Sequence, residues 1–396
     1  MNYIAAVNAL FSEYPGGPAR IAWDIARLMR DRGHKVTIFC CKEKPKAEEV
    51  SWHEDIKVVR YQTPETFSLD PFKVQKQIRA GLQVAEKHLT NTNWDVIHIH
   101  IDTQGNIIYK LLGPNFKYVY TVHSPSVLEQ KANWLADGIQ GRIKWIFGRG
   151  QLKKLEGRLL QKVDKIHTLS QFTKSMIDRF YGVGNKTTVI PHWCREGFFR
   201  QYNKQEARKI LNWPEDAKIL FSVRRLAPRM GLDIAIKSLG SLLKAYPNVF
   251  FALAGVGPEE EPLKQLARSL AVADKILFLG RISDDTLKRC YEASDLFVMP
   301  TVALECFGLP ILEALAYGLP VISTDAAALP ELMEPILPGC IVPAGDVEKL
   351  RQKVQAYLEN RLELPSSELL INYVKEHYGS QVISPRMVKL LESWTV

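Results

Sequence analysis

Short apolar runs alternate along the chain with longer stretches in which apolar residues recur every three or four positions. Within the runs the apolar residues are continuous, which is typical of strands buried on both faces of a parallel sheet. The intervening stretches have the spacing of amphipathic helices. The runs are 3–9, 35–41, 56–61, 95–100, 117–122 and 165–169 in the first half, and 218–223, 249–254, 275–279, 295–299 and 320–324 in the second.

Strands that alternate with helices predict an α/β fold with doubly wound parallel sheets, and two such sets predict two Rossmann-like domains. A chain of 396 residues can form two separate cores. The stretch 190–200 follows a strand and precedes an amphipathic helix at 205–211, so we place the boundary there. The predicted domains are 1–197 and 198–380, followed by a terminal helix in 381–396.

The charge is unevenly distributed. The whole chain has a net charge of +9, but residues 1–200 hold 30 Lys and Arg against 19 Asp and Glu, a balance of +11, and the remainder is slightly acidic. The first half is therefore expected to meet an anionic partner, either a membrane surface, a phosphorylated acceptor or a nucleic acid. No RNA- or DNA-binding motif accompanies the charge, so we expect no nucleic acid partner.

The N-terminus and the cysteines favour a cytoplasmic protein. The start, Met1 to Val7, lacks the basic segment of a signal peptide, and no apolar run reaches the ~18 residues of a membrane helix. The six cysteines have no Cys-x-x-Cys spacing and are expected to be reduced, buried and apolar in character.

The segment 301–323 places Glu305 and Glu313 on either side of a Gly-Leu-Pro turn. Pro310 suits the first turn of a helix, which then ends near Gly318. The N-terminus of this helix presents free N–H groups and a partial positive charge, which favour a phosphate. Two carboxylates beside a phosphate suggest a nucleotide-sugar, because carboxylates accept hydrogen bonds from hydroxyls. The alternative is a buried strand–turn–helix with two solvated acids.

This segment resembles the E-x7-E signature of the retaining nucleotide-sugar glycosyltransferases of family 4, since E-x-F-G-L-P-x-x-E-A-x-A-x-G-x-P-V-I is matched almost in full. The resemblance implies the GT-B fold, in which two Rossmann-like domains face a central cleft and the terminal helix crosses back to the first domain. It implies a retaining hexosyltransferase-type enzyme that moves a sugar from a nucleotide-diphosphate sugar, such as a UDP or GDP sugar, to a glycan, glycolipid or small molecule. The first domain would face the acceptor and the second would hold the donor.

The loop 221–232 carries arginines that leave a buried strand, where they are suited to bind a diphosphate. A surface loop with ordinary charges is the alternative. The family usually shows R-L-x-x-x-K-G here, with the Arg and the Lys on the diphosphate. Arg225 matches the arginine, but Met230 stands at the lysine position. We therefore expect Arg229 to supply the missing charge.

Other donor contacts follow from the resemblance. The glycine loop after the first strand would border the donor, and His123 would lie beside the transferred sugar. Glu305 would bind sugar hydroxyls and Glu313 the ribose. The remaining predicted donor-binding residues are Gly16, Gly17, Gly255, Arg281, Ile282, Phe307, Gly308 and Leu309. Three histidines, His98, His100 and His123, could suggest a metal, but no further ligand completes such a site. We therefore expect His98 and His100 to pack at the end of their strand.

The chain contains no Asp-x-Asp, so we expect catalysis without a metal, and no cofactor, since the nucleotide-sugar is a substrate. The stretch 141–162 mixes cations with Trp and Phe and predicts either a helix that lies on an anionic membrane or a solvated helix. A peripheral position on the inner face of the membrane would follow from the former. Two other functions stay open: a nucleotide-sugar epimerase, and a non-catalytic sugar- or nucleotide-binding protein of the same fold.

Overall fold

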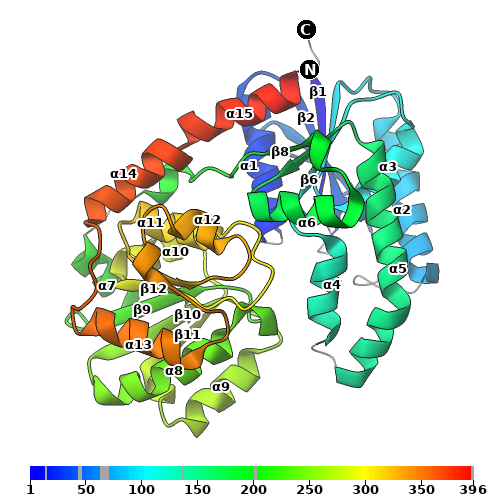
Figure 1. Ribbon diagram of the computed structural model, residues 1–396. Helices are drawn as coiled ribbons and strands as arrows, with labels where there is room; N and C mark the ends of the chain where they lie inside the picture. The colour runs from blue at the N-terminus through cyan, green and yellow to red at the C-terminus, as the bar shows by residue number, and fades with distance from the viewer. Residues whose placement is uncertain (14–15, 43–46, 63–70, 136–137, 200–202, 394–396) are drawn as a thin grey trace. The chain divides into compact units, whose positions relative to one another are not determined.

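A computed structural model describes residues 1–13, 16–42, 47–62, 71–135, 138–199 and 203–393. The chain forms two compact units (Figure 1). Unit 1 comprises Met1–Pro191 together with Ser384–Val396, and unit 2 comprises His192–Ile383. The division therefore falls after residue 191, whereas the sequence predicts the boundary after residue 197.

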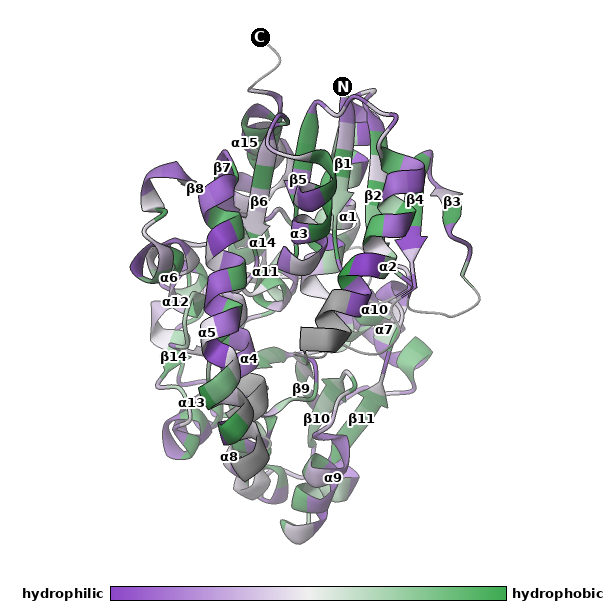
Figure 2. Ribbon diagram, turned by 90° about the vertical axis from the view of Figure 1, so that its right-hand side faces the viewer, coloured by the Kyte–Doolittle hydropathy of each residue, from purple (hydrophilic) through white to green (hydrophobic). Residues whose placement is uncertain are grey.

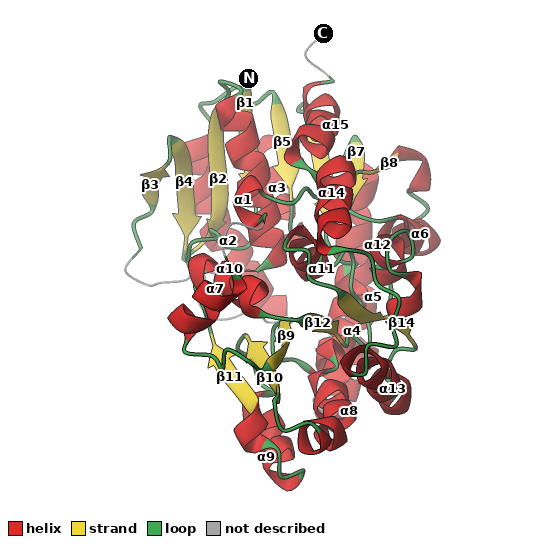
Figure 3. Cartoon of the chain, turned by 90° about the vertical axis from the view of Figure 1, so that its left-hand side faces the viewer, coloured by secondary structure: helices red, strands yellow, loops and turns green. Residues whose placement is uncertain are grey.

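The unit 1 sheet has the strand order β3-β4-β2-β1-β5-β6-β7-β8 (Figure 3). All neighbouring strands are parallel except the edge pair β3 and β4. Most strand residues are buried, as expected for a sheet covered on both faces. The strands are β1 Asn2–Ala6, β2 Lys35–Cys41, β3 Val50–His53, β4 Ile56–Tyr61, β5 Val96–Ile99, β6 Tyr118–Val122, β7 Lys165–Thr168 and β8 Thr187–Val189.

Helices cover both faces of this sheet, with α2, α3 and α5 on one side and α1 on the other (Figure 1). An apolar cluster lies under α2, α3 and α5, and it includes Ile107 and Leu159 together with strand residues such as Ile99. The unit 1 helices are α1 Gly17–Asp31, α2 Pro71–Leu89, α3 Asp102–Leu112, α4 Ser126–Leu135, α5 Gly138–Lys162 and α6 Gln171–Tyr181, with most of α15 Ser380–Glu392.

The unit 2 sheet is parallel throughout, in the order β11-β10-β9-β12-β13-β14. A cluster of Phe221, Tyr291 and Phe297 packs edge to face and tilted in its core, with ring centroids 5.4 to 5.8 Å apart. The strands are β9 Lys218–Val223, β10 Val249–Ala254, β11 Ile276–Gly280, β12 Leu296–Met299, β13 Val321–Thr324 and β14 Ile341–Val342. The helices are α7 Lys204–Leu211, α8 Leu232–Ala245, α9 Glu260–Ser269, α10 Asp284–Ala293, α11 Leu309–Ala316, α12 Leu329–Met333, α13 Val347–Leu358 and α14 Ser367–Tyr378.

Each of the eleven predicted runs overlaps a strand of the structure. Edge strands β3, β8 and β14 lie outside these runs, because β3 and β8 contain polar residues that interrupt an apolar run and β14 has only two residues. The terminal helix predicted in 381–396 corresponds to α15, and residues 394–396 lie outside the described residues. Near its C-terminal end, Glu392 pairs with Arg32 and His34 of unit 1.

Candidate active site

The carboxyl ends of β9 and β12 meet at the point where the strand order of unit 2 reverses. From β9 the chain runs outward through β10 to β11, and from β12 it runs outward on the other side to β14. In open α/β sheets, ligands bind beside the carboxyl ends of the strands at such a switch point. Arg224 directly follows β9, while Thr301 and Glu305 follow β12. The topology therefore brings these three side chains together.

Two glycines allow the backbone to close tightly around this point. Gly255 has φ +134°, and a Cβ atom there would lie 1.7 Å from the carbonyl oxygen of Arg224. Gly231 has φ +67°, and a Cβ atom there would lie 1.8 Å from the carbonyl oxygen of Pro300. Any other residue would force the loops apart, so these glycines fix the positions of the segments that carry Arg224 and Glu305.

The Arg224 guanidinium is the centre of the polar cluster. It forms an ion pair with Glu305 through Nη2 and donates from Nη1 to Thr301 Oγ1 at 2.7 Å. It also contacts the sulfur atoms of Met230, 3.0 Å from Nη2, and Met299. The Arg224 side chain is 4% exposed and that of Glu305 is 17% exposed. One face of the carboxylate is thus fixed by a buried cation.

The loop before α11 is shaped by two residues with positive φ, Leu304 at +58° and Gly308 at +103°. Gly308 is the N-cap of α11, as the Gly-Leu-Pro turn predicts, and it leaves the first amides of the helix without a side-chain cap. Leu304 is strained for a residue with a Cβ, and such strain is common at ligand sites. The helix N-terminus is therefore suited to an anion.

Glu313 has a different environment from Glu305. It lies within α11 and is buried, and its Oε2 accepts a hydrogen bond of 2.9 Å from the Tyr291 hydroxyl. The Tyr291 ring in turn stacks on Tyr317, with centroids 5.6 Å apart. The two carboxylates of the E-x7-E segment therefore have different partners, a cation for one and a neutral hydroxyl for the other.

The predicted arginines are arranged differently from each other. Arg225 is exposed, whereas Arg229 is half-buried and donates from Nη1 to the carbonyl oxygen of Leu304 at 3.0 Å. Sequence reasoning missed Arg224, although it stands next to Arg225 at the end of a strand. It missed Tyr291 because that residue belongs to α10, remote in sequence from the E-x7-E segment.

The remaining predicted donor residues occupy neighbouring loops of unit 2. Gly255 follows β10, and its N–H donates to the carbonyl oxygen of Gly280 at 2.8 Å, which places the start of the 281–282 segment beside it. Arg281 is exposed and Ile282 is half-buried. Phe307 is buried, with its ring 6.3 Å from that of Tyr378. Its side chain therefore packs within the unit, beside α14.

Unit 1 has its own switch point, between β1 and β5. His100 follows β5, and its Nδ1 lies 3.0 Å from Nε2 of His123, which follows β6. His98 is fully buried, 2.7 Å from the Tyr3 hydroxyl and 2.6 Å from Thr121 Oγ1. Burial holds the pKa of His98 well below its ordinary value, so this histidine is neutral. The predicted packing of His98 and His100 at the strand ends matches these positions.

The glycine loop after β1 is described in part, because Tyr14 and Pro15 lie outside the described residues. Gly16 is the N-cap of α1 with extended backbone, and Gly17 begins that helix. A Cβ atom on Gly17 would meet nothing within 4 Å. Internal packing therefore places no demand for glycine at Gly17.

Glu156 and Asp102 of unit 1 are buried carboxyl groups, and no cation is among their described contacts. Glu156 of α5 accepts from the Ser126 amide at 2.8 Å and from the Tyr181 hydroxyl. Burial, reinforced by the neighbouring Asp102 carboxyl, raises the pKa of Glu156 to about 7. Burial also raises the pKa of Asp102. Glu156 therefore favours the protonated form at mildly acidic pH.

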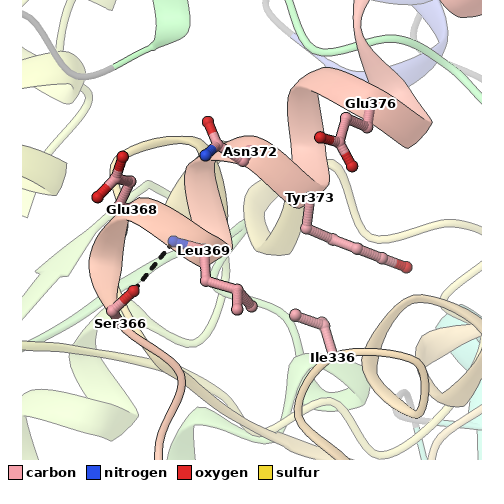
Figure 4. A pocket seen from close by; sticks show the side chains of 7 residues that line it. All are labelled: Ile336, Ser366, Glu368, Leu369, Asn372, Tyr373 and Glu376. Atoms are coloured by element: carbon pink, nitrogen blue, oxygen red, sulfur yellow. Dashed lines mark hydrogen bonds between the residues drawn. The ribbon is translucent and has the colours of Figure 1, made fainter.

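A separate hollow of about 420 Å³ lies along α14 (Figure 4). It contains two carboxylates and no cation, so it does not suit a phosphate. It includes none of the predicted site residues. Its lining residues are Ile336, Ser366, Glu368, Leu369, Asn372, Tyr373 and Glu376.

The described residues offer neither a metal site nor a helix that could span a membrane. They contain no group of three or more His, Cys, Asp or Glu side chains arranged to hold a metal ion. Their helices are all too short or too polar to span a membrane.

Two family models match the chain. The model of the glycosyl transferases group 1 matches residues 203–377, and the model of Glycosyltransferase Family 4 matches residues 15–194. The first lies in unit 2 and the second covers most of unit 1. Both halves of the chain are therefore accounted for by domains of the same class of enzyme.

Relatives whose names denote sugar-transferring enzymes also match the chain. An alpha-monoglucosyldiacylglycerol synthase of Streptococcus pneumoniae is 24% identical over 68% of this chain, and a D-inositol 3-phosphate glycosyltransferase of Acidothermus cellulolyticus is 25% identical over 72%. The matches span 59% and 65% of the lengths of these relatives. A phosphatidylinositol monomannoside mannosyltransferase of Corynebacterium glutamicum, named as GDP-mannose-dependent, is 27% identical over 59% of this chain and 63% of its own length.

Solved structures share the fold over almost the whole chain. A sucrose-phosphate synthase from Thermosynechococcus elongatus has a TM-score of 0.83 at 20% identity, covering 98% of both chains. The lipopolysaccharide glycosyltransferase WaaG has a TM-score of 0.77 at 17% identity, covering 98% of this chain and 99% of its own. These likenesses establish the GT-B architecture. With the two family models, they show that the chain belongs to the family 4-type glycosyltransferases of the GT-B fold.

Proposed function

We propose that this protein transfers a sugar from a nucleotide-diphosphate sugar to a hydroxyl of a lipid-linked or glycan acceptor, with retention of configuration and without a divalent metal. The observation that carries the proposal is the unit 2 switch point, where a carboxylate held by an arginine stands near the uncapped N-terminus of α11. A ligand with both phosphates and sugar hydroxyls fits this combination of groups. Unit 2 is therefore the donor unit in this proposal, and unit 1 the acceptor unit.

The donor contacts divide among the loops of unit 2. The amides of Gly308 and Leu309 and the guanidinium groups of Arg225 and Arg229 would stabilise the diphosphate. Glu305 would accept hydrogen bonds from sugar hydroxyls. Glu313, one turn inside α11, would accept from the ribose. Gly255, Arg281 and Ile282 would border the nucleotide, and His123 with the Gly16–Gly17 loop would serve the transferred sugar and acceptor from unit 1.

The reaction needs stabilisation of the leaving group. The bond between the sugar C1 and the diphosphate oxygen breaks, and the acceptor oxygen bonds to C1 on the same face. The leaving phosphate takes the acceptor proton, so no protein nucleophile is required. Negative charge grows on the diphosphate as the bond breaks, and preorganised cations and amides aimed at that charge lower the barrier most. No bound cofactor enters, because the nucleotide-sugar is itself consumed.

The test begins with the donor. A thermal-shift screen of nucleoside diphosphates and their sugars should identify one nucleotide that raises the melting temperature, since a ligand that binds only the native state stabilises it. The same donor should then be turned over with an acceptor. Conversion of the sugar without an acceptor would identify an epimerase instead. Binding without any turnover would identify a binding protein.

Retention and metal independence are tested on the same reaction. Proton NMR of the product should show the anomeric configuration of the donor. Activity should persist after exhaustive chelation, because the arginines and the amides of α11 supply the stabilising charge. Activity lost on chelation and restored by magnesium or manganese would disprove metal independence while leaving the transfer itself intact.

The lipid form of the acceptor is favoured by helix α5. Its exposed side chains include the apolar residues Ile143, Ile146 and Phe147, the last of which is 78% exposed. The cations Arg142 and Arg149 of the same helix are exposed as well. Figure 2 shows hydrophilic and hydrophobic segments alternating along this helix. Apolar side chains within a basic helix can insert at an anionic membrane surface. We place the protein in the cytoplasm, peripheral on the inner face of the membrane.

Sedimentation with anionic vesicles tests this surface. Binding should be strong at low salt and weaker at high salt, and Phe147→Ser should weaken it at both salt concentrations because the insertion is apolar. Neutral vesicles are the control. Binding that is absent, or independent of salt, would count against the lipid surface.

A further inference from the structure

Three arginines lie within the β9–α8 loop, and one of them, Arg224, forms an ion pair with a carboxylate of the E-x7-E segment. Arg225 is exposed, and Arg229 donates to a backbone carbonyl. Arg224 is buried and forms its ion pair with Glu305. The neighbouring Met230 cannot carry charge, and its sulfur lies 3.0 Å from Arg224 Nη2. The end of the residue 230 side chain therefore contacts the charged group of Arg224.

We propose that Arg224 is a positioning residue that orients Glu305 toward the sugar and balances its charge, and that it occupies the place that a cation on residue 230 would take. The proposal rests on the proposed function for the role of Glu305, but the arrangement of Arg224, Met230 and Glu305 stands by itself.

The contacts explain why only one cation fits. Lysine places its ammonium two bonds beyond the δ atom of its side chain, and the δ atom of Met230 already lies against the Arg224 guanidinium. A lysine at 230 would bring a second positive charge into a buried position beside the first. Two like charges at such a distance repel strongly where water is excluded. Arginine at 224 and an uncharged residue at 230 therefore belong together.

The pair also explains how Glu305 can serve near a diphosphate. A carboxylate without a counter-charge would repel the phosphates. A carboxylate free to rotate would also lose conformational entropy on binding the sugar, which would weaken the net effect of its hydrogen bonds. The guanidinium neutralises the first effect and removes the second, because Thr301 Oγ1 and the two methionine sulfurs fix the guanidinium itself. Arg224 thus acts through Glu305 rather than on the donor directly.

The first test is a double-mutant cycle on turnover. Arg224→Met should lower kcat by about 30-fold or more while changing the affinity for the free nucleoside diphosphate by less than about threefold, because the lost group holds the sugar-binding carboxylate. In a Glu305→Gln background the same change should cost less than about threefold. Equal losses in both backgrounds would overturn the proposal. Arg224→Lys should recover part of the turnover and serves as the measurement if Arg224→Met does not fold.

The matched control is Arg208→Met. Arg208 of α7 forms an ion pair of 2.7 Å with Asp295, which directly precedes β12. This pair is buried much like the Arg224–Glu305 pair but lies at the opposite edge of the same sheet, at the amino ends of the strands. The Arg208→Met variant should lose stability but keep the kcat of its folded fraction within about threefold. A comparable loss of kcat in this variant would show that Arg224 acts only by holding the fold.

The second test exchanges the position of the charge. Met230→Lys should lower the melting temperature of the otherwise unchanged protein, and Arg224→Met should remove that penalty. The Arg224→Met/Met230→Lys variant should regain at least about tenfold in kcat over Arg224→Met. An additive effect on melting would overturn the shared position. The melting data need no substrate, so they judge the arrangement even if no donor is ever turned over, an outcome that would refute the proposed function instead.

Discussion

Two buried arginine–carboxylate pairs occupy opposite edges of the unit 2 sheet. Arg208 and Asp295 stand at the amino ends of the strands, with side chains 5% and 9% exposed. Arg224 and Glu305 stand at the carboxyl ends, with side chains 4% and 17% exposed. Both arginines are almost completely buried, but the second carboxylate keeps more contact with solvent.

The two pairs differ in their other hydrogen-bond partners. Asp295 also receives Lys204 at 2.9 Å and the Ile219 amide at 2.6 Å, and Arg208 donates to the carbonyls of Ala293 and Glu215. These are contacts within the fold. For the Glu305 carboxylate, the described contact is with Arg224, beside a strained loop and a helix N-terminus. A pair at the amino edge holds elements together, whereas one at the carboxyl edge presents a charged group to a ligand.

The largest expected effect is on stability, at the amino edge. Asp295→Asn should reduce the free energy of unfolding by about 3–5 kcal/mol, because it leaves the buried Arg208 without its counter-charge. Glu305→Gln should cost less stability, since its carboxylate is nearer to solvent, but it should lower turnover by about 30- to 1000-fold. Urea unfolding and steady-state kinetics on both variants measure this difference. If Asp295→Asn lowered turnover more and Glu305→Gln lowered stability more, the amino-edge pair would not be structural and the carboxyl-edge pair would not be functional.

The next effect concerns a buried carboxylate with no arginine. Between its ordinary value near 4.5 and its raised pKa of about 7, the folded protein holds a proton on Glu156 that the unfolded chain has lost. The contribution of this group to stability is therefore complete below pH 4.5 and falls as the pH rises to 7, by about 3 kcal/mol in total. Unfolding of Glu156→Gln between pH 4.5 and 8 should lack this loss.

Tyr181→Phe sharpens the same measurement. The Tyr181 hydroxyl donates to the Glu156 carboxylate and so lowers its pKa. Without the hydroxyl, the loss of stability should extend to higher pH. If the stability of Tyr181→Phe depended on pH as that of the native protein does, Glu156 would not be the source of the loss of stability. His98 contributes with the opposite sign, since its lowered pKa costs stability as the pH falls below 6.5, so both slopes must be fitted together.

The smallest effect separates the two carboxylates of the E-x7-E segment. Glu313→Ala should weaken free nucleotide binding by about 1.5–3 kcal/mol through the loss of ribose hydrogen bonds, whereas Glu305→Ala should leave nucleotide affinity nearly unchanged. Isothermal titration with the nucleoside diphosphate measures both. Tyr291→Phe, which removes only the hydroxyl that holds Glu313, should weaken binding by about 1 kcal/mol. Equal effects of the two alanine variants would refute the separate roles.

Much of the architecture is determined locally and can therefore be predicted from the sequence. Continuous apolar runs specified the long strands, because a buried parallel strand must be apolar on both faces. The Gly-Leu-Pro turn specified the start of α11, because glycine alone tolerates the φ of +103° at Gly308 and proline suits the first helical turn. These features depend on a few adjacent residues. The resemblance of the E-x7-E segment added the family, which spacing alone would not have identified.

The partners of the site residues required the tertiary structure. The sequence pointed to Arg225 and Arg229, but the structure shows that Arg224 holds Glu305. The strand order places β9 beside β12, and the Arg224 side chain directly after β9 is buried whereas that of Arg225 is exposed. The contact of Tyr291 with Glu313 likewise joins α10 to α11. The raised pKa of Glu156 arises from burial and from the neighbouring Asp102 carboxyl, which is remote in sequence. Sequence fixes which groups are present, whereas burial and strand order decide which of them meet and whether they carry charge.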